Sequence, residues 1–352
     1  MTYKVADIFC GAGGLSYGFG KSDKFEIVFA NDIDENAINS YKANHKSTAI
    51  LNADIANLSK NELQKFGQID ILLGGPPCQS YSTLGKRQMD SRANLFKEYL
   101  RILSILSPKI FIFENVKGLL SMQGGTLFKQ ICSEFANLGY KINYKILNAA
   151  EFGVPQIRER VLLVGSKDKK EFIFPKPTHQ NFISLKEAID DLPIIKSGEN
   201  GDDKPYRFAP NNDFLKFVRK SLNLSEHISP KNNPNLIKIM QTLKDGECKD
   251  DLPCEIRPKS GYTNTYAKMW WNRPAPTITR NFATPSSSRC IHPRDSRALS
   301  IREGARLQSF PDDYKFCGSD QSKRLQIGNA VPPLLSIALA NSVLEYLGAN
   351  DV

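Results

Sequence analysis

The order of strand-like and helix-like segments in the first half of the chain limits its fold more than any other feature. Apolar runs typical of buried strands alternate with segments whose apolar residues recur at helical spacing, at intervals of roughly 30 residues. This alternation predicts a doubly wound, mostly parallel α/β sheet. The expected strands are residues 4–9, 25–30, 50–54, 69–73, 109–113, 140–147 and 161–164, and the expected helices are one starting near Leu15, then 35–44, 95–106 and 127–138.

The pattern changes after about residue 175, where Pro, Asn, Lys and Ser become frequent and periodic segments are short. Order returns near Arg302, and a last apolar helix is expected from about Pro333 to Tyr346. A chain of 352 residues is too long for one compact core. We therefore expect a large domain at 1–178, a smaller inserted domain at 179–300, and a return segment at 301–352 that completes the large domain.

Charge and cysteine content restrict the partners and the environment of the chain. Its net charge of +10 favours a polyanionic partner, nucleic acid first, although a solvated basic surface is the alternative. Seven cysteines without repeat spacing favour reduced thiols in a cytoplasm, and with only four scattered histidines we expect no metal site. The N-terminus lacks a signal-peptide pattern and no apolar run approaches ~20 residues, so no membrane partner is expected.

One cysteine, Cys78, ends the run Gly-Gly-Pro-Pro-Cys at residues 74–78. The run follows the expected strand 69–73, so the thiol falls where open α/β sheets hold their ligands. Each proline fixes its own φ and restricts the residue before it, which pre-shapes the loop. A buried structural thiol is the alternative, but this frame favours a nucleophile, because part of a thiol population is already thiolate near neutral pH.

A glycine turn, Gly11-Ala12-Gly13-Gly14, follows the first expected strand and lets a ligand approach the backbone. Its spacing departs from the dinucleotide fingerprint Gly-x-Gly-x-x-Gly, which disfavours a nicotinamide oxidoreductase. Asp32 is placed for a ribose hydroxyl pair and Asp54 for an adenine amino group, unless each is only a cap or turn residue. Two carboxylates would repel a pyrophosphate, so S-adenosylmethionine, with its sulfonium cation, fits better.

Two further polar motifs follow strands of the same sheet. Glu114 ends the strand beside the one that leads to Cys78, and in a dry site it can stay protonated or share a proton with a ring nitrogen. Arg158 and Arg160 lie in an extended segment. We expect one of these arginines to enter the site and the other to brace it or to meet phosphate.

Six motifs occur in a fixed order along the chain. They are residues 7–14 (DIFCGAGG), 76–79 (PPCQ), 114–116 (ENV), 156–160 (QIRER), 302–310 (REGARLQSF) and 326–332 (QIGNAVP). With them the chain resembles a C5-cytosine DNA methyltransferase of the bacterial restriction–modification type over most of 4–165 and 300–346. The variable stretch 179–300 is expected to be that family's target recognition domain, and residues 1–178 the catalytic and cofactor-binding domain.

The resemblance implies a mechanism for methylating C5 of cytosine, which alone is too weakly nucleophilic to react. The Cys78 thiolate adds to C6 while Glu114 donates to N3, so that C5 can take a methyl group from S-adenosylmethionine. Arg160 hydrogen-bonds the O2 edge, and Arg158 supports it or the backbone. The base must be flipped out of the duplex to react.

The resemblance also implies contacts outside these groups. The loop that follows Pro77, up to residue 90, is expected to close over the base, with Gln79 and Ser82 touching DNA. In the recognition domain we expect DNA contacts from Arg280 and Asn281. The residues expected to touch the cofactor, besides the glycine turn and the two aspartates, are Phe9, Leu15, Ile33, Ile55, Pro77, Leu95, Asn329 and Ala330.

Two other classes within the same ancestry fit less well. A non-catalytic DNA-binding relative is expected to lack Cys78 or Glu114, and this chain has both. A transfer-RNA methyltransferase is expected to carry a Cys-Phe-Thr run after the variable region, and the sequence has none. We therefore expect a cytoplasmic, nucleoid-associated monomer that acts on double-stranded DNA. The sequence leaves open whether a cognate restriction endonuclease exists; such an enzyme would act on the same sequence without stable association.

Overall fold

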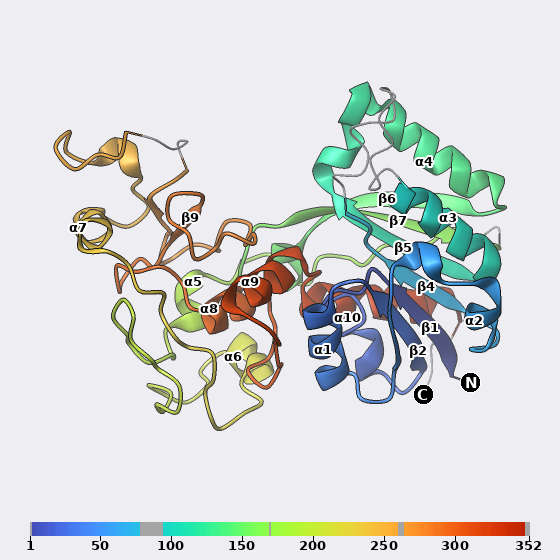
Figure 1. The fold of residues 1–352 in the computed structure, drawn as a ribbon, viewed down its shortest axis with the longest axis horizontal. Coiled ribbons are helices and arrows are strands. Elements are labelled where there is room, and N and C mark those ends of the chain that lie inside the picture. The colour runs from blue at the N-terminus through green and yellow to red at the C-terminus, as the bar shows by residue number, and fades with distance from the viewer. Residues whose placement is uncertain (1, 78–93, 169, 260–263, 349–352) are drawn as a thin grey trace. The chain divides into compact units, whose positions relative to one another are not determined.

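The computed structural model describes residues 2–77, 94–168, 170–259 and 264–348 (Figure 1). The chain forms two compact units. The first unit consists of Met1–Asn148, Glu159–Lys176 and Leu335–Val352, and the second of Ala149–Arg158 and Pro177–Leu334. The boundary after Lys176 lies two residues from the expected one. Residues 301–334, which we expected in the large domain, pack within the second unit instead.

The first unit is built on a seven-stranded sheet with the order β3-β2-β1-β4-β5-β7-β6. All adjacent pairs from β3 to β5 are parallel, whereas β7 runs antiparallel to both β5 and β6. The prediction of a mostly parallel α/β sheet is confirmed. The strands are β1 (Tyr3–Ile8), β2 (Phe25–Asp32), β3 (Ala49–Asn52), β4 (Ile71–Gly74), β5 (Ile110–Val116), β6 (Lys141–Asn148) and β7 (Glu159–Ser166).

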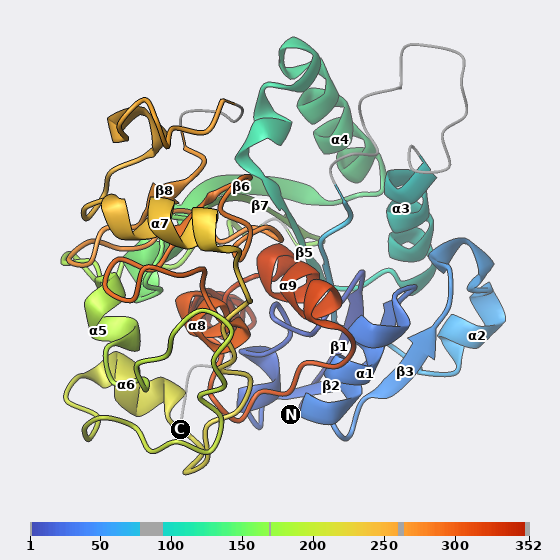
Figure 2. The same ribbon diagram turned by 60° about the vertical axis from the view of Figure 1, so that its left-hand side comes forward.

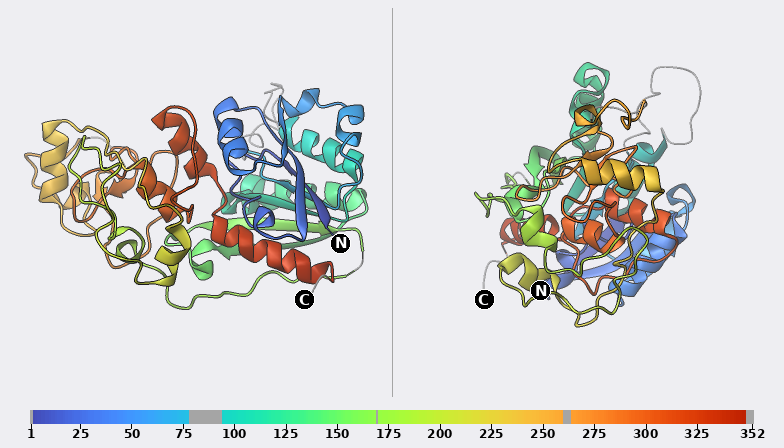
Figure 3. Two further views of the ribbon diagram at one scale, coloured as in Figure 1. Left: turned by 90° about the horizontal axis from the view of Figure 1, so that it is seen from below. Right: turned by 90° about the vertical axis from the view of Figure 1, so that its left-hand side faces the viewer.

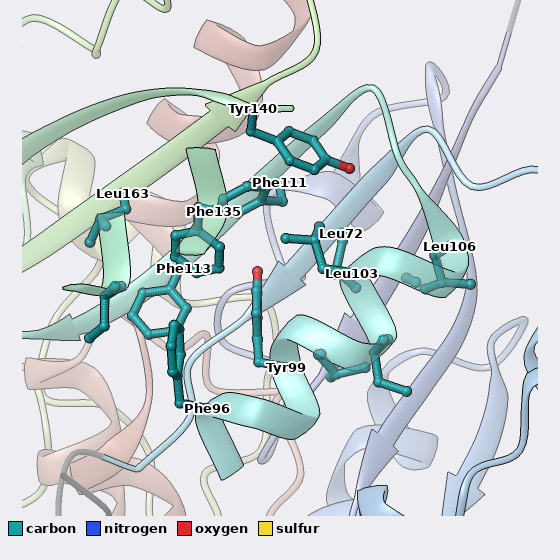
Figure 4. Close-up of a cluster of buried hydrophobic side chains, with 14 of the residues drawn as sticks. Leu72, Phe96, Tyr99, Leu103, Leu106, Phe111, Phe113, Phe135, Tyr140 and Leu163 are labelled. Carbon is teal, nitrogen blue, oxygen red and sulfur yellow. The ribbon is translucent and has the colours of Figure 1, made fainter. Parts of the chain in front are cut away.

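One face of the sheet is covered by α2 (Lys60–Gln64), α3 (Asn94–Leu106) and α4 (Thr126–Asn137) over an aromatic core (Figure 4). Tyr99 meets Phe113 nearly edge-on with ring centroids 5.1 Å apart, and Phe111 lies 4.6 Å from Phe135. Aromatic pairs of this kind contribute about 0.5–1.5 kcal/mol beyond their burial. Because strand side chains alternate, Phe111 and Phe113 face this core while Glu114 projects toward the opposite face.

The opposite face carries α1 (Glu35–Asn44) and α10 (Pro333–Tyr346) (Figure 3). Asp34 caps α1 by accepting a hydrogen bond from the backbone N–H of Ala37 at 3.0 Å. By length and composition the stretch Asp320–Tyr346 is apolar enough to cross a membrane, but 61% of its apolar window is buried inside the protein. This burial is what a core helix of a globular protein shows.

The segment after the glycine turn is not the helix that we expected near Leu15. It runs through turns and ends in a short 3-10 helix, Phe19–Lys21. Gly18 lies so close to α10 that a Cβ there would stand 2.4 Å from the carbonyl carbon of Ser336. Ser336 also accepts a hydrogen bond from the Gly18 N–H at 2.9 Å and donates one to the Leu15 carbonyl. The contact with α10 therefore fixes this segment in a non-helical path.

The second unit has little regular structure (Figure 2). Its helices and strands are α5 (Leu185–Ile189), α6 (Asp213–Val218), α7 (Pro234–Thr242), β8 (Ala267–Lys268), β9 (Arg289–Ile291), α8 (Ile301–Leu307) and α9 (Asp320–Asn329). The remaining 3-10 helices of the described chain are Ile55–Asn57, Lys117–Leu120, Met122–Gly125, Ala149–Phe152 and Lys249–Asp251. We had not expected α6 or α9.

Buried arginines hold the second unit together and explain why 301–334 belongs to it. Arg306 is fully buried and donates to Asp191 and, at 2.7 Å, to Asp312. Arg297 makes two hydrogen bonds to Glu303, at 2.7 and 2.8 Å. Burial alone would raise the pKa of Glu303. The charge and hydrogen bonds of the Arg297 guanidinium have the larger effect and hold that pKa well below its usual range. The Arg306–Asp191 pair connects α8 to a segment 115 residues earlier in the chain.

Arg306→Ala should destabilise the protein strongly, because it leaves the carboxylates of Asp191 and Asp312 buried without their cation. Removing one partner of a buried pair costs about 3–5 kcal/mol. Lys216→Ala is the control, since it removes an exposed ion pair with Asp213 in the same unit. Urea unfolding of both variants checks this, and equal effects of the two substitutions would show that the buried pairs do not hold the unit.

Candidate active site

An ion pair between Glu114 and Arg160 lies at the edge of the sheet where β5 ends. The Arg160 Nε atom is 3.0 Å from Glu114 Oε1, and each side chain is only 12% exposed. Because β7 runs antiparallel to β5, Arg160 pairs with Val116 and reaches Glu114 diagonally on the same face. Arg160 also donates from Nη1 to the Glu159 carbonyl at 2.8 Å. The sheet thus brings together two of the residues that the sequence indicated.

The end of β4 lies directly beside this pair, because Gly74 is aligned with Phe113 in the parallel β4–β5 ladder. A Cβ on Gly75 would stand 2.9 Å from Glu114 Oε2, so any larger residue there would displace the Glu114 carboxylate. Asn115 donates from Nδ2 to the Pro76 carbonyl at 3.0 Å. Sequence reasoning gave Asn115 no role, although its position beside Glu114 at a strand end was a signal.

Pro77, an exposed residue, is the last described residue of this loop. Cys78, Gln79 and Ser82 lie outside the described residues. The two strand ends therefore place Glu114 and Arg160 beside the Gly75–Pro77 backbone, which continues directly into Cys78.

Arg158 lies in the second unit, apart from the pair formed by Arg160. It is buried and donates to the backbone carbonyls of Ile278 (3.0 Å), Gly328 (3.0 Å) and Ala330 (2.9 Å). Through these contacts Arg158 supports the backbone of the second unit, which is one of the two roles that we considered for it. Arg158 and Arg160 have different surroundings because β7 begins at Glu159, so Arg160 lies within the strand and Arg158 precedes it.

The glycine turn after β1 is closed against the end of β2. Gly11 and Gly13 have positive φ values of 53° and 91°, a conformation that favours glycine. The Gly11 N–H donates to Asp32 Oδ2 at 2.8 Å, and the Asp34 N–H donates to Asp32 Oδ1 at 3.0 Å. Burial raises the pKa of Asp32, while these backbone donors oppose the rise. Ala12, Gly14 and Leu15 of the turn are buried.

A buried carboxyl beneath the turn, Asp7, is a second group that sequence reasoning left without a role. It accepts a hydrogen bond from the Ser16 hydroxyl, which in turn accepts one from Tyr41 at 2.9 Å. Its other oxygen, Oδ1, is buried without a hydrogen-bond partner among the described residues. Burial raises the pKa of Asp7 to about 7, against the effect of the Ser16 hydrogen bond. An acid inside an apolar strand was the available signal.

The other residues expected to touch a cofactor have varied surroundings. Asp54 is exposed and accepts from the Ala56 N–H at 3.0 Å, which is the turn-capping alternative that we considered. Ile55 is buried in the core beneath the sheet, and Phe9 and Leu95 pack against that core. Ile33 presents 67% of its side chain to solvent at the end of β2, which leaves it open to a flat ligand.

Asn329, Ala330, Arg280 and Asn281 all belong to the second unit. Asn329 ends α9, and the Ala330 carbonyl is one of the three that bind Arg158. A Cβ on Gly328 would lie 2.3 Å from the Arg280 nitrogen, so the Arg280 backbone passes directly over α9. The Arg280 side chain is exposed and that of Asn281 is half-buried.

The charges around the glycine turn fit a cationic ligand better than a polyanionic one. Asp7, Asp32 and Asp54 lie at or next to the ends of β1, β2 and β3, and within the described part of the chain Asp7 Oδ1 has no hydrogen-bond partner. In the described part of the chain, no group of three or more His, Cys, Asp or Glu side chains is arranged to hold a metal ion. The free space at Gly11, where an added Cβ would meet nothing within 4 Å, and the Asp32 carboxylate beside it fit S-adenosylmethionine, whose sulfonium is positive.

Comparison with known proteins gives the family. Residues 3–345 match the family model for C-5 cytosine-specific DNA methylases. The Type II methyltransferase M1.HphI of Haemophilus parahaemolyticus is 35% identical over 352 residues, covering 98% of this chain and 87% of that protein. The Type II methyltransferase M.DdeI of Desulfomicrobium norvegicum is 36% identical over 374 residues, covering 97% of this chain and 88% of that protein.

Solved structures show the same fold. A DNA modification methyltransferase encoded within an Escherichia coli prophage aligns with a TM-score of 0.81 at 24% identity, over 99% of this chain and 100% of that one. The chain belongs to the C-5 cytosine-specific DNA methylase family. It is a DNA (cytosine-5-)-methyltransferase, as the motifs indicated.

Asp7→Asn should change how stability depends on pH. The pKa of Asp7 is about 7 in the folded protein and near 3.9 in an unfolded chain, so the folded state binds the extra proton between these values. The free energy of unfolding of the wild type should therefore fall as pH rises from about 4 to about 7, and Asn should remove that part of the slope.

Urea unfolding of wild type and Asp7→Asn between pH 5 and pH 8 measures the effect. The stability of the variant should rise relative to the wild type across this range and level off above about pH 7. Asp23→Asn, at an exposed position, should run parallel to the wild type. If the stability of Asp7→Asn also varied with pH in parallel with the wild type, the raised pKa of Asp7 would be contradicted.

Proposed function

We propose that this methyltransferase transfers a methyl group from S-adenosylmethionine to C5 of a flipped-out cytosine through a covalent adduct between Cys78 and C6. The observation that carries the proposal is the buried Glu114–Arg160 pair beside the Gly75–Pro77 backbone, which leads directly into Cys78. A carboxyl and a guanidinium at one sheet edge, together with the thiol of Cys78, the next residue along the chain after Pro77, are the groups that activation of a cytosine ring needs.

The reaction begins when the Cys78 thiolate adds to C6 and the electrons of the C5–C6 double bond move toward N3. Glu114 donates a proton to N3 and accepts a hydrogen bond from the 4-amino group, so C5 becomes enamine-like. When bound, S-adenosylmethionine supplies the methyl group that C5 then accepts. A base removes the C5 proton, the electron pair re-forms the C5–C6 double bond, the Cys78 thiolate leaves, and N3 returns its proton to Glu114.

Arg160 controls the protonation of Glu114 in this scheme. With no base bound, its guanidinium pairs with the Glu114 carboxylate at 3.0 Å. A base whose O2 takes an Arg160 N–H weakens that pair in a site shielded from water, which favours a proton on Glu114. Asn115 holds the Pro76 carbonyl and so positions the loop that carries Cys78.

We propose that the cofactor contacts the backbone of the glycine turn and the Asp32 carboxylate. The further proposed contacts are the remaining residues expected from the sequence, namely Asp54, Phe9, Leu15, Ile33, Ile55, Pro77, Leu95, Asn329 and Ala330. The Asp32 carboxylate accepts hydrogen bonds from the backbone N–H groups of Gly11 and Asp34, which hold it beside the turn where a ribose hydroxyl would bind. The negative charge around the turn favours the positively charged sulfonium over its neutral product.

The DNA contacts of the second unit complete the proposal. Residues 179–300 recognise a short duplex sequence, with Arg280 and Asn281 at the DNA and Gln79 and Ser82 on the loop after Cys78. The named relatives are Type II methyltransferases, which supports a role as the modification enzyme of a restriction–modification system. A cytoplasmic monomer that needs no stable complex with an endonuclease fits this role.

Duplex DNA carrying 5-fluorocytosine at the target position should trap the protein covalently. Fluorine cannot leave C5 as a cation, so the adduct through Cys78 persists after methyl transfer. Denaturing electrophoresis with S-adenosylmethionine present should show a shifted band that Cys78→Ser abolishes, because an alcohol is a far weaker nucleophile at neutral pH. Trapping that survives Cys78→Ser would place the nucleophile elsewhere.

A further inference from the structure

The second unit contains a cavity of about 350 Å³ that is lined by polar and aromatic side chains. Trp270 and Arg289 form one part of its wall, and Asn264, Thr279 and Ser288 contribute hydrogen-bonding groups. The volume is within the range of sites that hold small molecules or single bases. Neither the catalytic scheme nor the expected contacts of Arg280 and Asn281 use this cavity.

Arg289 is held in one orientation at the cavity. Its Nη1 atom donates to the carbonyls of Gly246 at 2.8 Å and Lys268 at 2.5 Å. Its guanidinium carbon lies 4.2 Å from the Trp270 ring centroid. A Cβ on Gly246 would stand 2.1 Å from Trp270 Nε1, so this arrangement requires glycine at 246. The side chain is thus ordered before any ligand arrives.

The electrostatic surroundings of Arg289 differ from those of the buried arginines in the same unit. Arg297, Arg302 and Arg306 each have carboxylate partners within 4.0 Å. Among the described residues, no carboxylate lies within that distance of Arg289, although Asp251 attracts its charge from farther away. The two hydrogen bonds above both use Nη1. The Nε and Nη2 edge therefore offers two parallel N–H donors to an incoming acceptor.

A second guanidinium extends the same surface toward the residues expected at DNA. Arg273 lies over the Trp270 ring as well, 5.7 Å from its centroid. Ser288 donates to the Asn281 carbonyl at 2.8 Å, which connects the cavity wall to the Arg280–Asn281 turn. The cavity is therefore continuous with the segment that we assign to DNA contact.

We propose that Arg289 is a specificity-determining residue that reads a guanine of the recognition sequence through N7 and O6. Two parallel N–H donors on one planar edge match these two acceptors, and arginine on guanine is the commonest specific contact in the major groove. Stacking on Trp270 holds the plane of the guanidinium. The inference rests on the proposed function, because it takes duplex DNA to be the substrate.

A double-mutant cycle between protein and DNA tests the proposal. After the recognition sequence has been mapped by 5-methylcytosine sequencing of host DNA, each guanine of a cognate duplex is replaced in turn by 7-deazaguanine, which lacks the N7 acceptor. Binding to wild type and Arg289→Ala is measured by fluorescence anisotropy. Wild type should lose about 5- to 150-fold in affinity at one guanine, and Arg289→Ala should show no further loss at that guanine.

Two further variants make the outcome decisive. Arg289→Lys keeps the charge but not the planar pair of donors, so it should lose the same discrimination even if the alanine variant folds poorly. Lys238→Ala removes an exposed charge from the same unit and should keep the wild-type response to every analogue. If 7-deazaguanine weakened binding by the same factor in wild type and in both Arg289 variants, the proposal would be overturned. Arg289 would then contact a phosphate or have a structural role. Failure of the wild type to methylate cytosine would instead refute the proposed function itself.

Discussion

The active site depends on one interaction, the ion pair between Glu114 and Arg160 across the β5–β7 ladder. Parallel strands bring their carboxyl ends to one edge of a sheet, and an antiparallel strand brings its amino end to that same edge. Arg160, the second residue of β7, therefore meets Glu114 near the end of β5. Each side chain is only 12% exposed, so water solvates each charge poorly. The opposite charge of the partner compensates for this lost solvation.

The same edge sets the path of the loop that leads to Cys78, the proposed nucleophile. Asn115 holds the Pro76 carbonyl, and a Cβ at position 75 would displace the Glu114 carboxylate. The Gly75–Pro77 backbone is therefore positioned by the strand that carries Glu114, the proposed proton donor. The residues that precede β7, Ala149–Arg158, belong to the second unit, where Arg158 donates to three backbone carbonyls.

Much of the first unit could be predicted from the sequence, because strands buried on both faces and regularly spaced helices leave strong local patterns. The mostly parallel sheet and the enzyme family are confirmed. The prediction of a helix near Leu15 was wrong. The path of this segment depends on the close approach of Gly18 to Ser336, which lies in a helix more than 300 residues later in the chain. α9 was missed because its sequence is mainly polar. Contacts such as Asn115 to Pro76 depend on which strands are neighbours, which local patterns do not encode.

A double-mutant cycle on the central ion pair tests the account most directly. Single-turnover methyl transfer to a cognate duplex would be measured for wild type, Glu114→Gln, Arg160→Ala and the double variant, with Lys117→Ala in the exposed Lys117–Glu159 pair as the control. If the two residues act as one unit, the double variant should be about as slow as the slower single variant. Rate losses that multiply, leaving the double variant slower by the product of both effects, would contradict the account.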